Sequence, residues 1–386
     1  MSAFANPLVS RLSPPPIPSV LAWAREYKGA KGSLVDLSQA VPGYPAHPEM
    51  LRLLGEAASS PKTAGYGPIE GEGVLRDVYA QHMSDVYGAQ VCAANIHITA
   101  GCNQAFMSAA IALAGAGDTV ALTNPFYFNQ ETTLSMLGIK RVLVDCDAEN
   151  GFLPEVQSAK RALVGGAKVL AVVTPNNPTG AIYPPELLLE LFTLCRKHGA
   201  WLIVDETYRD FLPKGYGAPH PLLTIPGWED TLILLYSFSK SFCIPGHRLG
   251  AITAGVNVVT EITKVMDNMQ ICAPRAAQVA VAKAMPILAD WRAGNRLEIA
   301  RRADALRAVM SGLPGWEIGA VGAYFAFIRH PFEDLSSTAV AERLAKEVGV
   351  VCLPGSYFGE GQEHYLRLAF ANADAASIGL LADRLR

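Results

Sequence analysis

A lysine in a hydroxyl-rich segment is the first candidate for chemistry in this sequence. Lys240 lies in Ser237-Phe-Ser-Lys-Ser241, directly after an apolar run, and Gly246-His-Arg-Leu-Gly250 follows it closely. Lysine at the end of a buried strand is unusual, because it is rarely buried without a partner. A cationic neighbourhood lowers the pKa of lysine from about 10.4, which favours a nucleophilic amine. The flanking hydroxyls and Arg248 could bind a phosphate, whereas an exposed lysine in a polar loop is the ordinary alternative.

An aspartate closes a second apolar run. Asp205 lies in Val204-Asp-Glu-Thr-Tyr208. A carboxylate at the end of a buried strand is costly unless it meets a partner. Asp205 could therefore pair with the cationic nitrogen of a ring, although a metal ligand or a helix N-cap would explain it equally well.

Two glycine-containing segments also follow predicted strands. Thr99-Ala-Gly-Cys-Asn-Gln-Ala105 leads from a strand into a helix, whose first N–H groups would suit a phosphate. Asn176-Asn-Pro-Thr-Gly180 has the composition of a turn. A plain turn would explain either segment alone. All four segments, however, lie at or just beyond predicted strand ends, which is where ligands bind in open α/β sheets.

Alternating strand and helix signals position these segments. Most of the predicted strands are continuous apolar runs, which is typical of a mostly parallel sheet buried on both faces. Helical stretches such as 185–198 lie between several of them, which predicts a doubly wound α/β domain. The predicted strands are 95–100, 119–123, 141–145, 168–174, 200–205, 232–237 and 249–254.

The character of the chain changes after about residue 285. A charged helical stretch, 290–310, precedes short strands at 324–328 and 365–370 and a final helix at 374–385. We expect this part to form a second, smaller α/β domain.

The N-terminal part is rich in proline. Residues 13–19 are expected to lead into a short helix at 20–27, with the prolines before its first turn. The predicted domain division is 1–45 as a segment packing with the small domain, 46–285 as the large domain, and 286–386 as the small C-terminal domain.

Composition excludes several classes of protein. The net charge of −3 gives no reason to expect nucleic acid or a membrane surface as partner, and no apolar run approaches the roughly 20 residues of a membrane span. The seven cysteines lack a Cys-x-x-Cys pair, which suits free thiols in the cytoplasm. The histidines lack ligand spacing, so no metal site is expected.

Together, and in this order, the four segments resemble the class I and II aminotransferases, which depend on pyridoxal 5′-phosphate (PLP) and have fold type I. The resemblance runs from Leu37 to Phe370, and Ser-x-Ser-Lys followed by Gly-x-Arg-x-Gly is its most specific part. It implies a fold like that of aspartate aminotransferase. The large domain would have a mostly parallel seven-stranded sheet flanked by helices, beside a smaller α/β domain.

The resemblance also implies catalytic roles. Lys240 would carry PLP as a Schiff base and move the proton. Asp205 would keep the pyridine nitrogen protonated, so that the ring accepts electrons. Tyr208 and Asn177 would hydrogen-bond the phenolic oxygen of the ring.

Further residues would bind the cofactor. Tyr127, in Asn124-Pro-Phe-Tyr127, matches the aromatic residue that stacks on the ring, and Phe126 is a possible substitute. Tyr66 matches the tyrosine that reaches the phosphate of the neighbouring subunit, which implies a homodimer with shared active sites. The remaining cofactor-binding residues would be Gly101, Cys102, Asn103, Ser237, Ser239 and Arg248.

Three positions concern the substrate. Arg367, in Tyr365-Leu-Arg-Leu-Ala-Phe370, matches the arginine that binds the substrate α-carboxylate, assisted by Asn177. Ala40 replaces a glycine that is common in the family beside that carboxylate, so the pocket is expected to be narrower or reshaped. Arg275 stands where a small hydroxyl residue is common; it could reach the neighbour's phosphate, meet an acidic substrate, or be a surface charge.

The predicted function is transfer of the amino group of an α-amino acid to a 2-oxo acid by a ping-pong mechanism. A lyase or synthase of the same fold remains the alternative, because Lys240, Asp205 and Arg367 serve both. A ligand-sensing regulator would need a DNA-binding segment, which residues 1–36 are too short and too poor in basic residues to form. A dinucleotide-binding oxidoreductase would need a Gly-x-Gly-x-x-Gly loop after the first strand, and this sequence has no such loop there.

Overall fold

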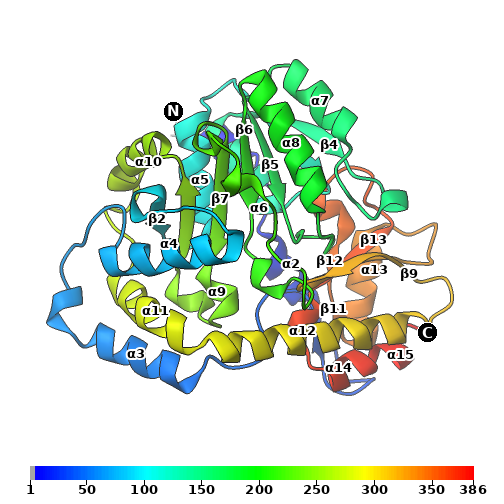
Figure 1. The fold of residues 1–386 in the computed structure, drawn as a ribbon. Coiled ribbons are helices and arrows are strands. Elements are labelled where there is room, and N and C mark those ends of the chain that lie inside the picture. The colour runs from blue at the N-terminus through cyan, green and yellow to red at the C-terminus, as the bar shows by residue number, and fades with distance from the viewer. Residues whose placement is uncertain (1–4) are drawn as a thin grey trace, which may run out of the picture.

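A seven-stranded sheet forms the centre of the computed structural model, which describes residues 5–386 (Figure 1). The strand order is β2-β8-β7-β6-β5-β3-β4, and only β8 runs antiparallel to its neighbours. The mostly parallel α/β sheet predicted from the apolar runs is therefore confirmed. The strands are β2 Ile96–Thr99, β3 Thr119–Asn124, β4 Lys140–Asp145, β5 Val169–Val173, β6 Trp201–Asp205, β7 Leu232–Ser237 and β8 Gly250–Ala254.

Helices cover both faces of this sheet, which explains why its strands are apolar throughout. Along β6, Leu202 and Val204 pack into one core and Ile203 into the other, because successive side chains point to opposite faces. The first core includes residues of α3 Pro48–Ala58, α4 Gly73–Tyr87, α7 Val156–Val164, α8 Pro185–His198 and α11 Arg275–Ile287. The second includes residues of α5 Cys102–Leu113, α6 Phe128–Leu137 and α10 Val256–Met269.

The C-terminal part builds a separate antiparallel sheet with the order β12-β13-β10-β9. Its strands are β9 Glu317–Gly322, β10 Phe325–Arg329, β12 Leu353–Pro354 and β13 Tyr365–Leu368. The long helix α12 Ala289–Met310 runs alongside, and α13 Ser337–Arg343 follows β10 (Figure 1). The single helix expected at 374–385 is wrong in one respect: it is divided at Leu380 into α14 Ala375–Gly379 and α15 Leu381–Arg384.

The N-terminal segment joins this C-terminal part through one pair of strands, because β1 Val35–Asp36 pairs in parallel with β11 Val350–Val351. Its two helices are α1 Pro7–Ser10 and α2 Pro16–Ala24. The helix expected at 20–27 therefore starts earlier and also ends earlier, at Ala24, and Pro16 and Pro18 lie inside its first turn rather than before it. Proline is tolerated there because the first N–H groups of a helix have no partner within it.

Candidate active site

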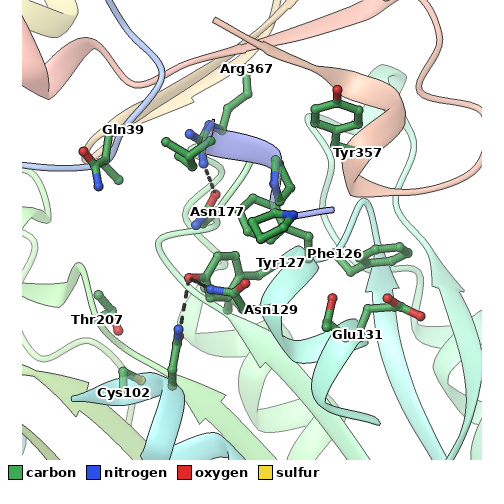
Figure 2. Close-up of a pocket in the computed structure, with 18 of the residues that line it drawn as sticks. Gln39, Cys102, Phe126, Tyr127, Asn129, Glu131, Asn177, Thr207, Tyr357 and Arg367 are labelled. Carbon is green, nitrogen blue, oxygen red and sulfur yellow. Dashed lines mark hydrogen bonds between the residues drawn. The ribbon is translucent and has the colours of Figure 1, made fainter. Parts of the chain in front are cut away.

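The predicted site residues gather around one cavity of about 1280 Å³, bounded by the ends of β5, β6 and β7 and by β13 (Figure 2). This volume exceeds the roughly 300–1,000 Å³ of an ordinary ligand pocket, so it has room for a cofactor and a substrate. Gly101 adjoins the cavity, and Tyr66 lies outside it. The expected residues that line it are Ala40, Cys102, Asn103, Tyr127, Asn177, Asp205, Tyr208, Ser237, Ser239, Lys240, Arg248 and Arg367.

Lys240 lies in a single helical turn that follows β7, α9 Phe238–Ser241. The Oγ of Ser237 caps this turn by accepting a hydrogen bond from the backbone N–H of Ser239 at 3.3 Å. The Nζ of Lys240 donates to the carbonyl oxygen of Ala40. Burial, together with the charges of Arg248 and Arg367, lowers the pKa of Lys240 to about 8. At pH 7 about one tenth of this amine is therefore neutral, and so nucleophilic, far more than for an ordinary lysine.

Asp205 ends β6, with both carboxylate oxygens in hydrogen bonds. Oδ1 accepts from the N–H and the hydroxyl of Thr207 at 3.0 and 2.7 Å, and Oδ2 accepts from Nε2 of Gln130 at 3.2 Å. Burial raises the pKa of Asp205, and the hydrogen bonds from Thr207 and Cys102 partly oppose this. Sequence reasoning missed Gln130, because a single amide side chain in α6 carries no pattern.

Arg367 reaches the cavity from β13 and is only 2% exposed. Its Nη1 donates to Oδ1 of Asn177 at 3.2 Å, and its Nη2 donates to the carbonyl of Ser38. Its Nε is buried without a partner, which leaves a donor available to a ligand. Burial lowers the pKa of Arg367 to about 10. A guanidinium in this position would bind a carboxylate strongly, because without one its positive charge stays buried and unpaired, which is costly.

The turn before α5 combines with Arg248 into a site suited to an anion. Gly101 has φ +89°, and a Cβ there would lie 2.2 Å from Nη2 of Arg248, so the glycine makes room for the guanidinium. Arg248 donates to the carbonyls of Pro245 and Ala100 at 2.9 and 3.2 Å. Nearby, the Oγ of Ser239 is buried without a partner. These donors and the first N–H groups of α5 fit a phosphate group.

Both candidate aromatic residues line the cavity. The hydroxyl of Tyr127 accepts a hydrogen bond from Nδ2 of Asn129 at 2.7 Å and lies 3.4 Å from Oδ1 of Asn103 (Figure 2). Burial raises the pKa of Tyr127 to about 12. Phe126 lies next to it in the wall, so the choice between the two as the stacking residue stays open.

Tyr66 lies outside this cavity and is 80% exposed. The segment that carries it is held by Arg275, whose Nη1 donates to the carbonyls of Gly65 and Tyr66 at 3.0 and 3.2 Å. The Nε of Arg275 donates to Glu72. Arg275 therefore supports the Tyr66 segment and is bonded within its own chain.

Residues 5–386 contain neither a metal-ligand cluster nor a membrane-spanning helix. No group of three or more His, Cys, Asp or Glu side chains there could hold a metal ion. Within the same range, no helix is long and apolar enough to cross a membrane.

Known proteins resemble this chain over nearly its whole length. Residues 33–385 match the family model for aminotransferase class I and II. An aromatic aminotransferase of Arabidopsis thaliana is 29% identical, covering 95% of this chain and 92% of that protein. An aspartate aminotransferase of Pyrococcus horikoshii is 26% identical, covering 80% and 79%. The structure of a double mutant of Thermus thermophilus aspartate aminotransferase superposes with a TM-score of 0.91 at 25% identity, covering 99% of each chain.

Proposed function

The chain belongs to the class I and II aminotransferases, and on that premise we propose which of its residues carry out the reaction. The protein is a PLP-dependent enzyme of fold type I that moves the amino group of an α-amino acid to a 2-oxo acid. Its residues fit the cofactor. The unpartnered Oγ of Ser239, the space that Gly101 leaves beside Arg248, and the start of α5 suit the phosphate.

PLP, when bound, accepts the electron pair released at the substrate Cα. We assign its phosphate to Gly101, Cys102, Ser237, Ser239 and Arg248, and its ring to Asn103, Tyr127, Tyr208 and Asn177. Support comes from the cavity that all of them border or adjoin. These residues would hold the cofactor in the cavity that Lys240 also lines.

Lys240 would hold the cofactor through Nζ, and its free amine would move the proton at the substrate Cα. The observation that carries this proposal is the position of Lys240 in the cavity wall, in the helical turn after β7, where burial lowers its pKa to about 8. An amine with this pKa can both accept and return a proton near neutral pH.

Asp205 stabilises positive charge on the ring nitrogen. Its carboxylate is buried and bonded only to neutral donors of the protein. A buried carboxylate without a cationic partner is costly, so a protonated nitrogen within reach offsets that cost.

Arg367 binds the α-carboxylate of the substrate, and Asn177 orients the guanidinium. The backbone of Ala40 borders the same space and accepts the hydrogen bond from Lys240. The substrate is thereby held with its Cα near the amine that moves the proton.

The active unit that we propose is a homodimer in which Tyr66 of each subunit completes the site of the other. Two observations support it: Tyr66 is exposed, and Arg275 fixes the segment that carries it. In a two-fold dimer this exchange is reciprocal.

We also propose that the domains divide at about residues 45 and 285 and that the protein is cytoplasmic. The separate sheets on either side of α12 support the first. The second is supported by the seven cysteines, all of which have free thiols.

The test is dependence on an amino acceptor. An aminotransferase turns over repeatedly only while a 2-oxo acid acceptor is supplied, whereas an elimination lyase continues without one. When the acceptor is omitted, we expect product formation to stop after one 2-oxo acid molecule has formed per active site. Sustained turnover without an acceptor would support the lyase alternative, and a Lys240→Ala variant gives the background rate.

A further inference from the structure

Apolar side chains line much of the outer part of the cavity, beside polar ones such as Gln39, Asn129 and Ser356. With the α-carboxylate at Arg367 and the Cα near Lys240, the substrate side chain extends toward the remaining walls. These come from the N-terminal segment, the start of α6 and the short 3-10 helix Gly355–Phe358 (Figure 2). The apolar lining residues there are Pro16, Ile17, Val41, Phe126, Phe128 and Tyr357.

Charged groups are unevenly distributed around the cavity. Among the described residues, six charged side chains line it, and four of them are those assigned to the cofactor and the α-carboxylate. The other two are Glu131 and Arg141, which form an ion pair with each other. Glu131 also accepts a hydrogen bond from Ser135 at 2.7 Å, which fixes its carboxylate.

The charge of Arg141 is therefore already compensated. Its guanidinium binds Glu131, approaches Glu360 at 3.7 Å, and lies 5.5 Å from the ring centre of Phe126. Two carboxylates and an aromatic face surround this one cation. A further carboxylate, brought by a substrate, would meet a cation whose charge Glu131 already offsets.

Arg275 offers no substitute. It lies outside the cavity of its own chain, and its Nε and Nη1 are bonded to Glu72 and to the carbonyls of Gly65 and Tyr66. Within one subunit, an acidic substrate side chain would thus lose its hydration without gaining an uncompensated cation, while an apolar one gains by burial.

We propose that the amino donor has a bulky, uncharged side chain, aromatic or aliphatic, and that Glu131 disfavours acidic donors by neutralising Arg141. This inference rests on the proposed function, since it takes the positions of the carboxylate and the Cα from Arg367 and Lys240. It selects one substrate class within a family whose members differ in their donors.

The first test compares donors in the half-reaction without acceptor, followed by the absorbance of the bound cofactor. We expect kcat/KM for phenylalanine and leucine to exceed that for aspartate and glutamate by at least about tenfold. A calorimetric comparison of 3-phenylpropanoate with succinate tests binding alone, and the former should bind more tightly. Equal or better performance of the acidic compounds overturns the proposal and leaves the aminotransferase function intact; failure of every donor counts against the function itself.

The second test releases Arg141. In Glu131→Gln, we expect the ratio of kcat/KM for aspartate to that for phenylalanine to rise about tenfold. The reason is that the charge of Arg141 in the cavity wall is then no longer offset by Glu131. The ratio is measured within one preparation, so partial loss of folded protein cancels. Glu261→Gln is the control, because it breaks an exposed ion pair with Lys264 on α10 and should leave the ratio unchanged. An unchanged ratio in folded Glu131→Gln overturns the role of Glu131.

Discussion

Nε2 of Gln130 donates a hydrogen bond to Oδ2 of Asp205 across 3.2 Å, linking α6 to the end of β6. The two oxygens of Asp205 thereby receive bonds from opposite sides, Gln130 on one and Thr207 on the other. The plane of the carboxylate is fixed before any ligand arrives. A fixed carboxylate loses little energy in reorganising during the reaction.

Loss of that bond should slow the chemistry without removing the cofactor. We expect Gln130→Leu to lower the half-reaction rate by about 10- to 100-fold, since a hydrogen bond to a charged group is worth about 1.5–3 kcal/mol. Stopped-flow absorbance of the bound cofactor gives this rate. Thr133→Val is the matched control, because Thr133 lies on the same helix and bonds only the carbonyl of Asn129. Equal rates in the two variants would contradict a role for Gln130.

Asp205→Asn should have a larger effect. The amide keeps the shape of the carboxylate but supplies no negative charge to the ring nitrogen. Electrostatic contributions of this kind are worth about 3–4 kcal/mol, so we expect the half-reaction to slow by roughly 10²- to 10³-fold with PLP still bound. Equilibrium dialysis measures retention of the cofactor. Activity within a few-fold of the parent would remove Asp205 from this role.

Removal of the cofactor should make stability depend on Lys240 and pH. The pKa of this lysine falls from 10.5 to about 8 on folding. Between these values the unfolded chain holds one more proton than the folded chain, so the stability of the apoprotein rises with pH. We expect Lys240→Met apoprotein to be more stable than the parent apoprotein by about 2–3 kcal/mol at pH 7, with the difference vanishing near pH 10.5.

Urea unfolding of both apoproteins at several pH values measures this difference. Lys214→Met, at an exposed position, serves as the reference for loss of a lysine charge. A stability difference that stays constant from pH 7 to pH 10.5 would mean that Lys240 titrates alike in the folded and unfolded chains.

Arg367→Ala should weaken binding of every substrate that carries an α-carboxylate, whatever its side chain. Removing one partner of a close charge pair typically costs about 2–5 kcal/mol. We expect KM to rise for several donors by similar factors, and Arg329→Ala on the neighbouring β10 to have little effect. The proposed role fails if amines without a carboxylate are the better substrates of the parent enzyme.

Subunit exchange tests the shared site. Tyr66→Ala and Lys240→Ala proteins should each have little or no activity, and mixing them should restore some. If Tyr66 acts on the partner, the mixed dimer has one doubly damaged site and one intact site. If Tyr66 acts within its own chain, every site of the mixed dimer keeps one defect. No gain in activity, with mixed dimers demonstrated by mass spectrometry of differently tagged chains, would rule out the exchange.

Strand positions were the part of the fold most accessible from sequence. Continuous apolar runs predicted all seven strands of the large sheet, to within one residue at each end, because burial on both faces leaves a clear signal. The polar residues at their ends, such as Lys240 and Asp205, were found for the same reason. Two contacts within the site could not be predicted from the sequence. Gln130 contacts Asp205, and Glu131 contacts Arg141, only after helices pack on the sheet. The position of the Pro-rich segment in the cavity wall could not be predicted either, because proline content does not specify where a segment packs.

Because of that wall, donor selectivity and catalytic chemistry depend on different parts of the chain. Residues 12–19 contribute to the cavity, yet none of the side chains assigned to the cofactor or to the α-carboxylate comes from them. Substitutions in this short stretch can therefore be screened as a cassette for new donor preferences, while the residues that move the proton remain untouched. In protein engineering, the start of this chain is a place where selectivity can be varied independently of chemistry.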